Sequence, residues 1–431
     1  MTLFRLALFG LTVAMSSCAV SLCDKDPTDP RCDQSPVSPD TLQVLPIRIP
    51  LSGEHITVRL GIGTGTVVLR QNGKEVALGT LSDGVLQVHV TDQMLSQAMI
   101  TLGDAKIVVS RPSKADEAAA IRLFVEPAFD PIISYDTKQD GETPEGLVIK
   151  PSAGLWGYTS FPRSGSRAQH FVEYQVMPGI ITARGPSFGN NTFAAWNERP
   201  ARTVRQGARL VGFSRDLFAM NADAIQLDTC AFSTELCSAV SATPDFTKVL
   251  GLASDSKGTM LAVVSDSDVF VYQSSDQSPL ARRLSVSGST SVGQKAALGD
   301  INGDGRIDLV TLSDGNASVF FGQQSGSFAL DATASGKLTT ALAGSVPTAV
   351  SSADIDLDGI DDLVVASGTS LQIIYPLPNG SYTTSAPLSG LDGTDIITIG
   401  AVDGKSNSGP DIAISSQKAQ RIAVLVNQST Y

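Results

Sequence analysis

Two nine-residue segments combine acidic residues and glycine at the spacing of a metal-binding loop. They are Asp300–Asp308 (DINGDGRID) and Asp354–Asp362 (DIDLDGIDD). In each segment, side-chain oxygens at positions 1, 3, 5 and 9 fall on one concave side, and glycine at position 6 permits a sharp turn. The residue at position 7 can add its backbone carbonyl oxygen. Ligands that are all hard oxygens suit Ca²⁺ better than Mg²⁺ or a transition metal.

The sequence therefore predicts two calcium sites. The candidate ligands of the first are Asp300, Asn302, Asp304, the carbonyl of Arg306 and Asp308; those of the second are Asp354, Asp356, Asp358, the carbonyl of Ile360 and Asp362. The alternative is an acidic turn without metal, in which the converging carboxylates would repel one another. An EF-hand is excluded, because position 12 is Thr311 or Val365 instead of glutamate and the following residues predict a strand instead of a helix.

The two loops belong to a set of repeated units. Five segments each hold a loop followed by two short apolar strands: 212–229, 251–273, 299–328, 353–382 and 400–431. Aligned on Asp216, Leu261, Asp308, Asp362 and Asp411, they recur every ~45–55 residues, a period typical of β-propeller blades. A solenoid is the alternative, but the strand density favours blades.

The segments 299–328 and 354–382 resemble FG-GAP (VCBS-type) repeats, the blades of integrin α-chain propellers and of many bacterial surface proteins. The other three segments resemble them more weakly, and together the five cover about half of the chain. The resemblance implies calcium loops on one face that make the blades rigid. It also implies ligand binding on loops of the opposite face, and it favours seven blades, although the spacing also allows six.

The other repeats have lost the metal-binding residues. In the second repeat only Asp255 remains at a ligand position, and Lys257 would oppose a cation. In the last repeat Ala401 replaces the first aspartate, while Asp403 and Asp411 remain, so weak binding is the most we expect there. The first repeat has only a short turn.

The predicted propeller spans residues 128–431. We expect β-structure in 128–201 but set no strand boundaries there, and Trp156 and Trp196 are interpreted as core or ring-closure residues. The chain ends where the fourth repeat would continue into another strand. The last blade is therefore expected to take its outer strand from the start of the array, which would close the ring.

Residues 41–127 predict a separate β-sandwich. Seven short segments rich in Val, Ile and Leu are punctuated by Gly, Asn and Asp: 42–49, 55–62, 65–73, 84–91, 98–103, 105–110 and 119–127. The stretch 72–103 resembles immunoglobulin-like TIG domains of surface proteins. His55 and His89 are interpreted as strand-surface residues, not as metal ligands. The fold class is therefore all-β, an immunoglobulin-like sandwich followed by a propeller.

The first residues have the form of a secretory signal peptide. Arg5 precedes an apolar run of about ten residues, too short to span a membrane, which takes ~20 residues. Cys18 after two serines resembles a bacterial lipobox, with Met15 where leucine is usual. An ordinary signal peptide is the alternative. The resemblance implies a signal peptide at 1–17, an acylated Cys18 and an outer-membrane or surface location in a Gram-negative cell. Residues 18–40, rich in Pro, Asp and Ser, predict an extended tether.

The remaining cysteines form two local pairs. Cys23 pairs with Cys32 in the tether, and Cys230 pairs with Cys237 in the first repeat. An oxidising compartment would let both pairs close as disulfides. A zinc site is the alternative, but the spacing is not CxxC and the three histidines lie elsewhere. We further hypothesise that the disulfide of the first repeat replaces calcium as a local cross-link in its blade.

The chain carries 43 acidic and 31 basic residues, a net charge of −12, which argues against nucleic acid as a partner. No GxSxG or HExxH motif and no Cys/His nucleophile pair occurs in the sequence, and His170 has no recognisable partners, so we expect no enzyme. We expect a surface- or envelope-anchored protein that binds a protein or glycan ligand and contacts the membrane only through its lipid. The alternatives are a structural subunit of an outer-membrane or secretion assembly and, less favoured, a propeller hydrolase or lyase.

Overall fold

The chain divides into two compact units, residues 1–126 and 127–431. The computed structural model describes residues 41–61, 63–112, 114–149, 155–163, 166–184, 210–212, 217–221, 227–231, 237–239, 249–265, 268–275, 278–288, 295–391, 393–402 and 409–429. In the described part of the chain, no helix combines the length and hydropathy needed to span a membrane.

Several sequence predictions fall outside the described residues. The predicted signal peptide, the predicted acylation site Cys18 and the predicted tether lie there. The predicted disulfide between Cys23 and Cys32 belongs to the tether, so both of its cysteines lie outside as well, and this disulfide stays a prediction from the sequence. Trp196, Asp216 and Asp403 are also outside the described residues.

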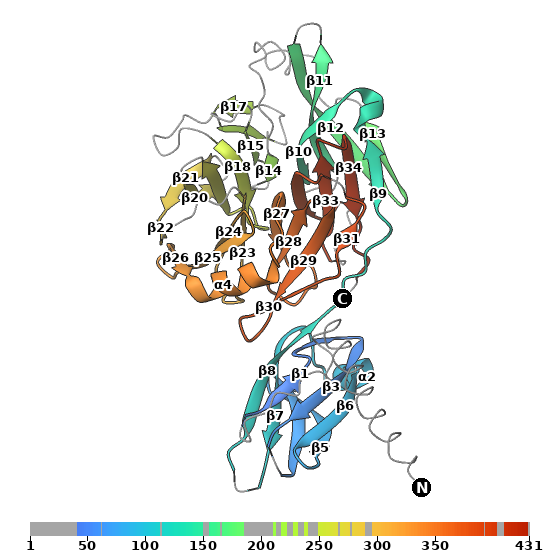
Figure 1. The fold of residues 1–431 in the computed structure, drawn as a ribbon, viewed down its shortest axis with the longest axis vertical. Helices are drawn as coiled ribbons and strands as arrows, with labels where there is room; N and C mark the ends of the chain where they lie inside the picture. Colours follow the sequence, from blue (N-terminus) through green and yellow to red (C-terminus); the bar gives the residue numbers. More distant parts are fainter. Residues whose placement is uncertain are drawn as a thin grey trace, which may run out of the picture. The chain divides into compact units, whose positions relative to one another are not determined.

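The first unit is a β-sandwich (Figure 1). A three-stranded sheet has the order β1-β3-β6, and a five-stranded sheet has the order β2-β8-β7-β4-β5. The strands are β1 (Gln43–Leu45), β2 (Arg48–Pro50), β3 (Gly53–Arg59), β4 (Gly65–Gln71), β5 (Lys74–Leu81), β6 (Val85–Thr91), β7 (Gly103–Ser110) and β8 (Glu117–Phe124). Alternate residues of both sheets, such as Val67, Leu69, Ile56 and Val58, form one buried core. The period-2 pattern of the sequence thus places one face of each sheet inside.

One segment of this unit differs from the sequence expectation. Residues 98–103 were expected to form a strand, but the helix α2 (Asp92–Gln97) ends there and β7 begins only at Gly103. The hydroxyl of Thr91 accepts the N–H of Met94 and starts the helix. The amide of the buried Gln71 then bonds to Thr101 N–H and to the Leu102 carbonyl. A side chain therefore supplies the hydrogen bonds that a strand would have found in a neighbouring strand.

The second unit is built from successive sheets of four or five strands. The 3₁₀ helix η1 (Thr137–Asp140) follows β9, and the helix α4 (Ala332–Ala341) follows β26. The strands are β9 (Ile133–Asp136), β10 (Thr143–Ile149), β11 (Leu155–Arg163), β12 (Ser166–Met177), β13 (Ile180–Arg184), β14 (Leu210–Gly212), β15 (Leu217–Asn221), β16 (Leu227–Ala231), β17 (Cys237–Ala239), β18 (Val249–Ser254), β19 (Met260–Ser265), β20 (Val269–Ser275), β21 (Ser278–Leu284), β22 (Val286–Ser287), β23 (Lys295–Gly299), β24 (Asp308–Ser313), β25 (Asn316–Gly322), β26 (Phe328–Asp331), β27 (Ala349–Ala353), β28 (Asp362–Ser367), β29 (Ser370–Pro376), β30 (Tyr382–Thr384), β31 (Leu388–Ser389), β32 (Ile396–Gly400), β33 (Asp411–Ser416) and β34 (Arg421–Leu425).

These sheets are the blades of a β-propeller. The described residues form six of them, and the innermost strands β10, β14, β18, β23, β27 and β32 contact one another in that order, with β32 returning to β10. The ring formed by the described residues therefore closes with six blades, whereas the integrin resemblance favoured seven. Residues 128–184, for which no boundaries were predicted, hold β9 and the first blade, β10 to β13.

The last blade takes its outer strand from the start of the array, as predicted. Strand β9 pairs antiparallel with β34, with Ile133 opposite Val424 and Tyr135 opposite Ile422. The two strands lie side by side in Figure 1 although almost the whole propeller separates them in sequence. The bridge Phe129–Asn427 and the bond from Gln428 N–H to the Ala128 carbonyl extend this closure.

The hydrophobic cores lie between neighbouring blades. In β28, Leu363 and Val365 pack into a cluster with the preceding blade, while Val364 and Ala366 pack into a cluster with the following one. A strand with two buried faces needs apolar residues in succession, which explains the run DLVVAS after the second loop. The helix α4 was not predicted. Its Leu338 joins the core beside β25, and it accounts for the longest spacing between repeats.

Candidate metal centre

The two predicted metal loops occupy equivalent places in neighbouring blades. The first loop connects β23 to β24, and the second connects β27 to β28. The pairs Gly299–Asp308 and Ala353–Asp362 are the last register pairs before each loop. The position-6 glycines, Gly305 and Gly359, have φ of +80° and +88°, a left-handed conformation that glycine adopts without strain. Each loop is thus a tight reversal between the two inner strands of a blade.

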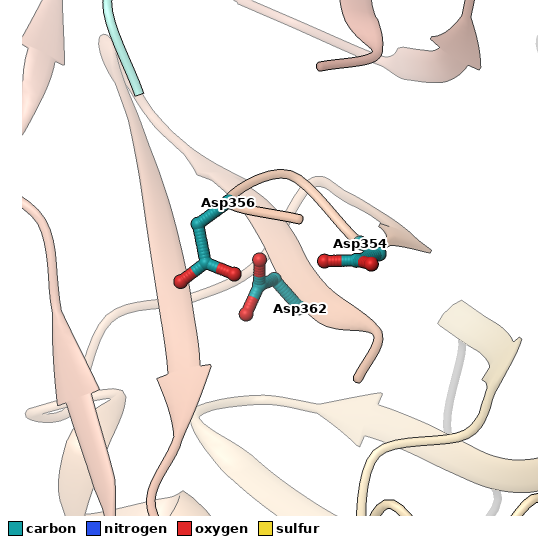
Figure 2. A group of neighbouring side chains, drawn as sticks. All are labelled: Asp354, Asp356 and Asp362. Atoms are coloured by element: carbon teal, nitrogen blue, oxygen red, sulfur yellow. The ribbon is translucent and has the colours of Figure 1, made fainter. Parts of the chain in front are cut away.

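The second loop brings three carboxylates together. Asp354, Asp356 and Asp362 each offer an oxygen such that all three oxygens lie within 4.8 Å of one another. Figure 2 shows the three carboxylates turned toward a common space, Asp354 and Asp356 from the loop and Asp362 from the start of β28. Asp356 and Asp362 are buried, and Asp354 is half-buried. Within the described residues this is the single group of three or more His, Cys, Asp or Glu side chains that converges so closely.

The charge of Asp354 is poorly compensated. The Oδ1 atom of Asp354 is buried, and no described group donates a hydrogen bond to it. Its Oδ2 atom accepts the N–H of Gly359 at 3.0 Å, and the backbone N–H groups of Gly359 and Asp358 offset part of the cost of burial. Burial, followed by the negative charge of Asp358, raises the pKa of Asp354 to about 7. A bound divalent cation would remove this electrostatic cost, so the donor set fits a hard cation such as Ca²⁺.

The other two predicted ligands of this loop lie beside the group of three. Asp358 is buried, and its Oδ1 atom accepts the N–H of Ile360 at 2.9 Å, while its own N–H bonds to Asp356. Ile360 is buried as well. The loop therefore presents its oxygens on a scaffold of short turns.

The first loop is arranged differently. The carboxylate of Asp300 accepts the N–H groups of Gly303 (2.8 Å), Asp304 (3.1 Å) and Gly305 (2.7 Å). Asn302 and Asp304 are exposed, and Asp304 forms an ion pair with the guanidinium of Arg306. Asp300, Asp304 and Asp308 do not converge as the second loop's carboxylates do. Here the loop's own N–H groups bind the Asp300 carboxylate, and one arginine pairs with Asp304.

The aspartate at position 9 has a structural role that extends beyond the metal loops. Asp308 accepts the N–H of Ile301 (3.1 Å) and of Gly322 (2.8 Å). Burial raises its pKa to about 7 despite these bonds, and the charges of Asp304 and Asp300 add to the shift. Asp411 in the last blade likewise accepts Val402 N–H and Asn427 N–H, both at 2.8 Å. This aspartate links the inner loop to the end of the third strand with or without a metal loop.

The degenerate loop after β18 closes on itself. Asp255, the residue retained there, accepts the N–H groups of Thr259 and Met260, both at 2.7 Å, and the Thr259 hydroxyl at 2.8 Å. Its carboxylate is thus committed to the turn, which agrees with the loss of ligands in the sequence.

The two cysteines of the disulfide predicted in the propeller lie opposite each other on neighbouring strands. Cys230 in β16 is directly opposite Cys237 in β17. Directly opposed residues of antiparallel strands have Cα atoms ~4.5–5.5 Å apart, within the range that a disulfide spans. The β16–β17 hairpin corresponds to the β25–β26 hairpin of the next-but-one blade, because each joins the third and fourth strands counted from the innermost one. The disulfide itself stays a prediction.

His55 and His89 are exposed on neighbouring strands of the sandwich. They are register partners in β3 and β6, and their rings stack with centroids 4.2 Å apart. Trp156 and His170 lie in β11 and β12.

Sequence reasoning missed Asp361, at position 8 of the second loop. Its Oδ2 atom accepts the N–H of Asp300 at 2.9 Å. Nothing in a metal-loop motif marks that position, so only the contact between the loops reveals it.

Residues 300–365, which contain both loops, match the FG-GAP-like repeat family. This confirms the FG-GAP resemblance for that stretch. A comparison with curated proteins gave no match.

Three solved structures from Bacteroides thetaiotaomicron are similar over most of the chain. A structural genomics protein of unknown function is 13% identical with a TM-score of 0.41, covering 91% of this chain and 99% of its own. An auxiliary nutrient binding protein is 10% identical with a TM-score of 0.40, covering 92% and 99%. A quinoprotein alcohol dehydrogenase-like protein is 9% identical with a TM-score of 0.35, covering 89% and 96%. Identities and TM-scores this low assign no function.

Proposed function

We propose that this chain is a lipid-anchored binding protein of the cell surface or envelope, whose propeller is stabilised by calcium. Its loops would recognise a protein or glycan ligand. The observation that carries the calcium part is the convergence of the carboxylates of Asp354, Asp356 and Asp362, together with a buried Asp354 oxygen to which no described group donates. The first loop is the proposed second site, with Asp300, Asn302, Asp304, the Arg306 carbonyl and Asp308 as ligands.

The calcium is proposed to be structural. It would lie between the two inner strands of a blade, where it would neutralise buried carboxylates and hold the loop closed. A ligand that binds only the folded state stabilises it by mass action, by about 4 kcal/mol at a thousand times its dissociation constant.

Calcium removal tests this proposal. Residues 19–431 would be melted in 2 mM Ca²⁺ and in EDTA, followed by circular dichroism and by resistance to protease. We expect a higher melting temperature and slower cleavage in Ca²⁺, with Mg²⁺ much less effective because it tolerates fewer and stricter ligand geometries. Equal melting in both solutions would contradict a structural calcium.

The lipid anchor has its own test. Cells expressing the full chain would be labelled with a palmitate analogue, with the Cys18→Ser variant as control. We expect label in the wild-type membrane fraction and none in the variant. Equal labelling of both chains, or label in neither, would contradict acylation at Cys18.

A binding experiment distinguishes the proposed recognition of a protein or glycan ligand from the alternative, a structural subunit of an envelope assembly. The soluble chain would be applied to glycan arrays and to host cells, and the anchored chain would be purified from membranes. Saturable binding to one glycan class or to cells supports recognition. A single stoichiometric envelope partner, without such binding, would instead support a structural subunit of an envelope assembly.

A further inference from the structure

We propose that the two metal loops act as one coupled calcium unit, in which Asp361 of the second loop positions the first. This inference rests on the proposed calcium function. Asp361 is a positioning residue here: it belongs to neither predicted ligand set, and it links one set to the other.

Asp361 holds both backbone polar groups of Asp300. Its Oδ2 atom accepts the N–H of Asp300 at 2.9 Å, and its own N–H donates to the Asp300 carbonyl at 2.9 Å. Asp300 is the first ligand residue of the first loop. Asp361 directly precedes Asp362, the last ligand residue of the second loop. A reciprocal pair of hydrogen bonds thus joins the end of one ligand set to the beginning of the other.

The packing around this pair is close. A Cβ atom at Gly299 would lie 2.7 Å from the Asp361 carboxylate, and one at Gly303 would overlap the side chain of Ile360. The hydroxyl of Ser352, at the end of β27, donates to the Leu298 carbonyl at 2.6 Å. At both glycines, side chains of the second loop lie directly against the first loop.

The two loops start from different states. The second has three converging carboxylates and an oxygen to which no described group donates, whereas the first is closed by its own N–H groups and by the Arg306–Asp304 ion pair. Calcium in the second loop would fix Asp362 and, one residue earlier, Asp361. Asp300 would then be held in place before the first loop binds its own ion. Positive coupling between the sites follows, and by linkage it acts equally in both directions.

Calcium titration of single-site chains tests the coupling. Residues 19–431 would be titrated by calorimetry as wild type, as Asp354→Ala with only the first loop competent, and as Asp304→Ala with only the second. We expect the wild type to bind two ions at least about five-fold more tightly than the product of the two single-site constants, the lower end of typical coupling. The same three chains would be measured with Asp361→Ala added to each. The two-ion binding constant of Asp361→Ala should then agree with the product of its two single-site constants within about two-fold, which is too small to count as coupling.

The conservative variant separates positioning from folding. In Asp361→Asn, the side-chain oxygen can still accept the Asp300 N–H, so we expect the coupling to return. Wild-type constants that equal the single-site product would overturn the proposal while leaving two calcium sites intact. An Asp361→Ala chain that keeps the full coupling would also overturn the proposal. If the wild type bound no calcium, the proposed function would fail as well. The wild-type comparison decides the matter even if Asp361→Ala does not fold.

Discussion

Asp354 shows how a single carboxylate depends on its surroundings. It is half-buried, one of its oxygens has no donor among the described groups, and its pKa is raised to about 7. At pH 8 without metal, the folded chain must ionise this group in an unfavourable place. With a cation bound, the same group becomes a ligand. The effect of neutralising it should therefore change sign with calcium.

We expect Asp354→Asn to raise the melting temperature in EDTA at pH 8 and to lower it in Ca²⁺. An uncompensated buried polar group costs about 1–3 kcal/mol, and 1 kcal/mol corresponds to about 2–4 °C in a domain of this size. We therefore expect a rise of roughly 2–12 °C in EDTA. The rise should shrink as the pH falls toward ~5, because Asp354 is then protonated in the folded wild type, whose raised pKa makes its stability fall as the pH rises.

The matched control is Asp314→Asn in the exposed turn after β24. Asp314 has φ of +43°, which asparagine also tolerates, so the backbone is not strained by the change. We expect the difference in melting temperature between this variant and the wild type to be the same in EDTA as in Ca²⁺. A fall in melting temperature for Asp354→Asn in both solutions would count against a metal at the second loop.

At the scale of elements, glycines show where blades and loops approach most closely. A Cβ at Gly322 would overlap the Ile307 carbonyl, beside the N–H that Asp308 accepts. In contrast, a Cβ at Gly336 in α4 meets nothing within 4 Å. Gly322 is needed because the end of the third strand of the blade, β25, lies directly against the residue before Asp308. Gly336 has no such neighbour and only weakens the helix α4.

We expect Gly322→Ala and Gly336→Ala to have opposite effects. Overpacking at position 322 should destabilise the propeller by about 1–3 kcal/mol. Alanine in the helix at position 336 should stabilise it by up to about 1 kcal/mol. Urea unfolding of both variants measures this. Equal and small changes would mean that the loop can shift away from Gly322.

The β16–β17 hairpin gives a second prediction at this scale. A disulfide between Cys230 and Cys237 closes a short loop, and removing it should cost about 2–3 kcal/mol. We expect a chain with serine at both of these positions to melt lower. The control is a chain in which Cys23 and Cys32 are both replaced by serine, which should leave propeller melting unchanged because these two cysteines precede the sandwich. Thiol titration of the unfolded wild type should find neither pair free. Unchanged melting of the first variant would refute the idea that this disulfide replaces calcium.

At the scale of the whole propeller, closure depends on a strand from the beginning of the unit. Strand β9 completes the blade of β32, β33 and β34, and Ile133 and Val424 share one core. Without β9, β34 would present an unpaired edge, which invites pairing with another chain.

We therefore expect a chain that begins at Lys138 to melt lower and to associate, compared with a chain that begins at Pro127. The two differ by a segment that includes all of β9. Melting and light scattering at several concentrations measure the effect. Identical behaviour would show that the ring holds without its closing strand.

The sequence by itself determined the elements whose signal is local. The aspartates and glycines of the two loops, the apolar strands after them and the repeat spacing follow from period and composition. They predicted the propeller and the strand that closes it. The helix α4, which Asp331 caps by accepting the N–H of Ala334, was missed. The course of residues 98–103 was missed because the buried Gln71 binds their backbone.

Only the tertiary structure decided how neighbouring blades act on one another. It closed the described ring with six blades, since the innermost strands meet in a cycle that no repeat count can show. It also distinguished two loops that share one sequence motif: Arg306 pairs with Asp304 in one, while three carboxylates converge in the other. The physical reason is that burial, donors and counter-charges come from residues far apart in the chain, as when Asp361 reaches Asp300.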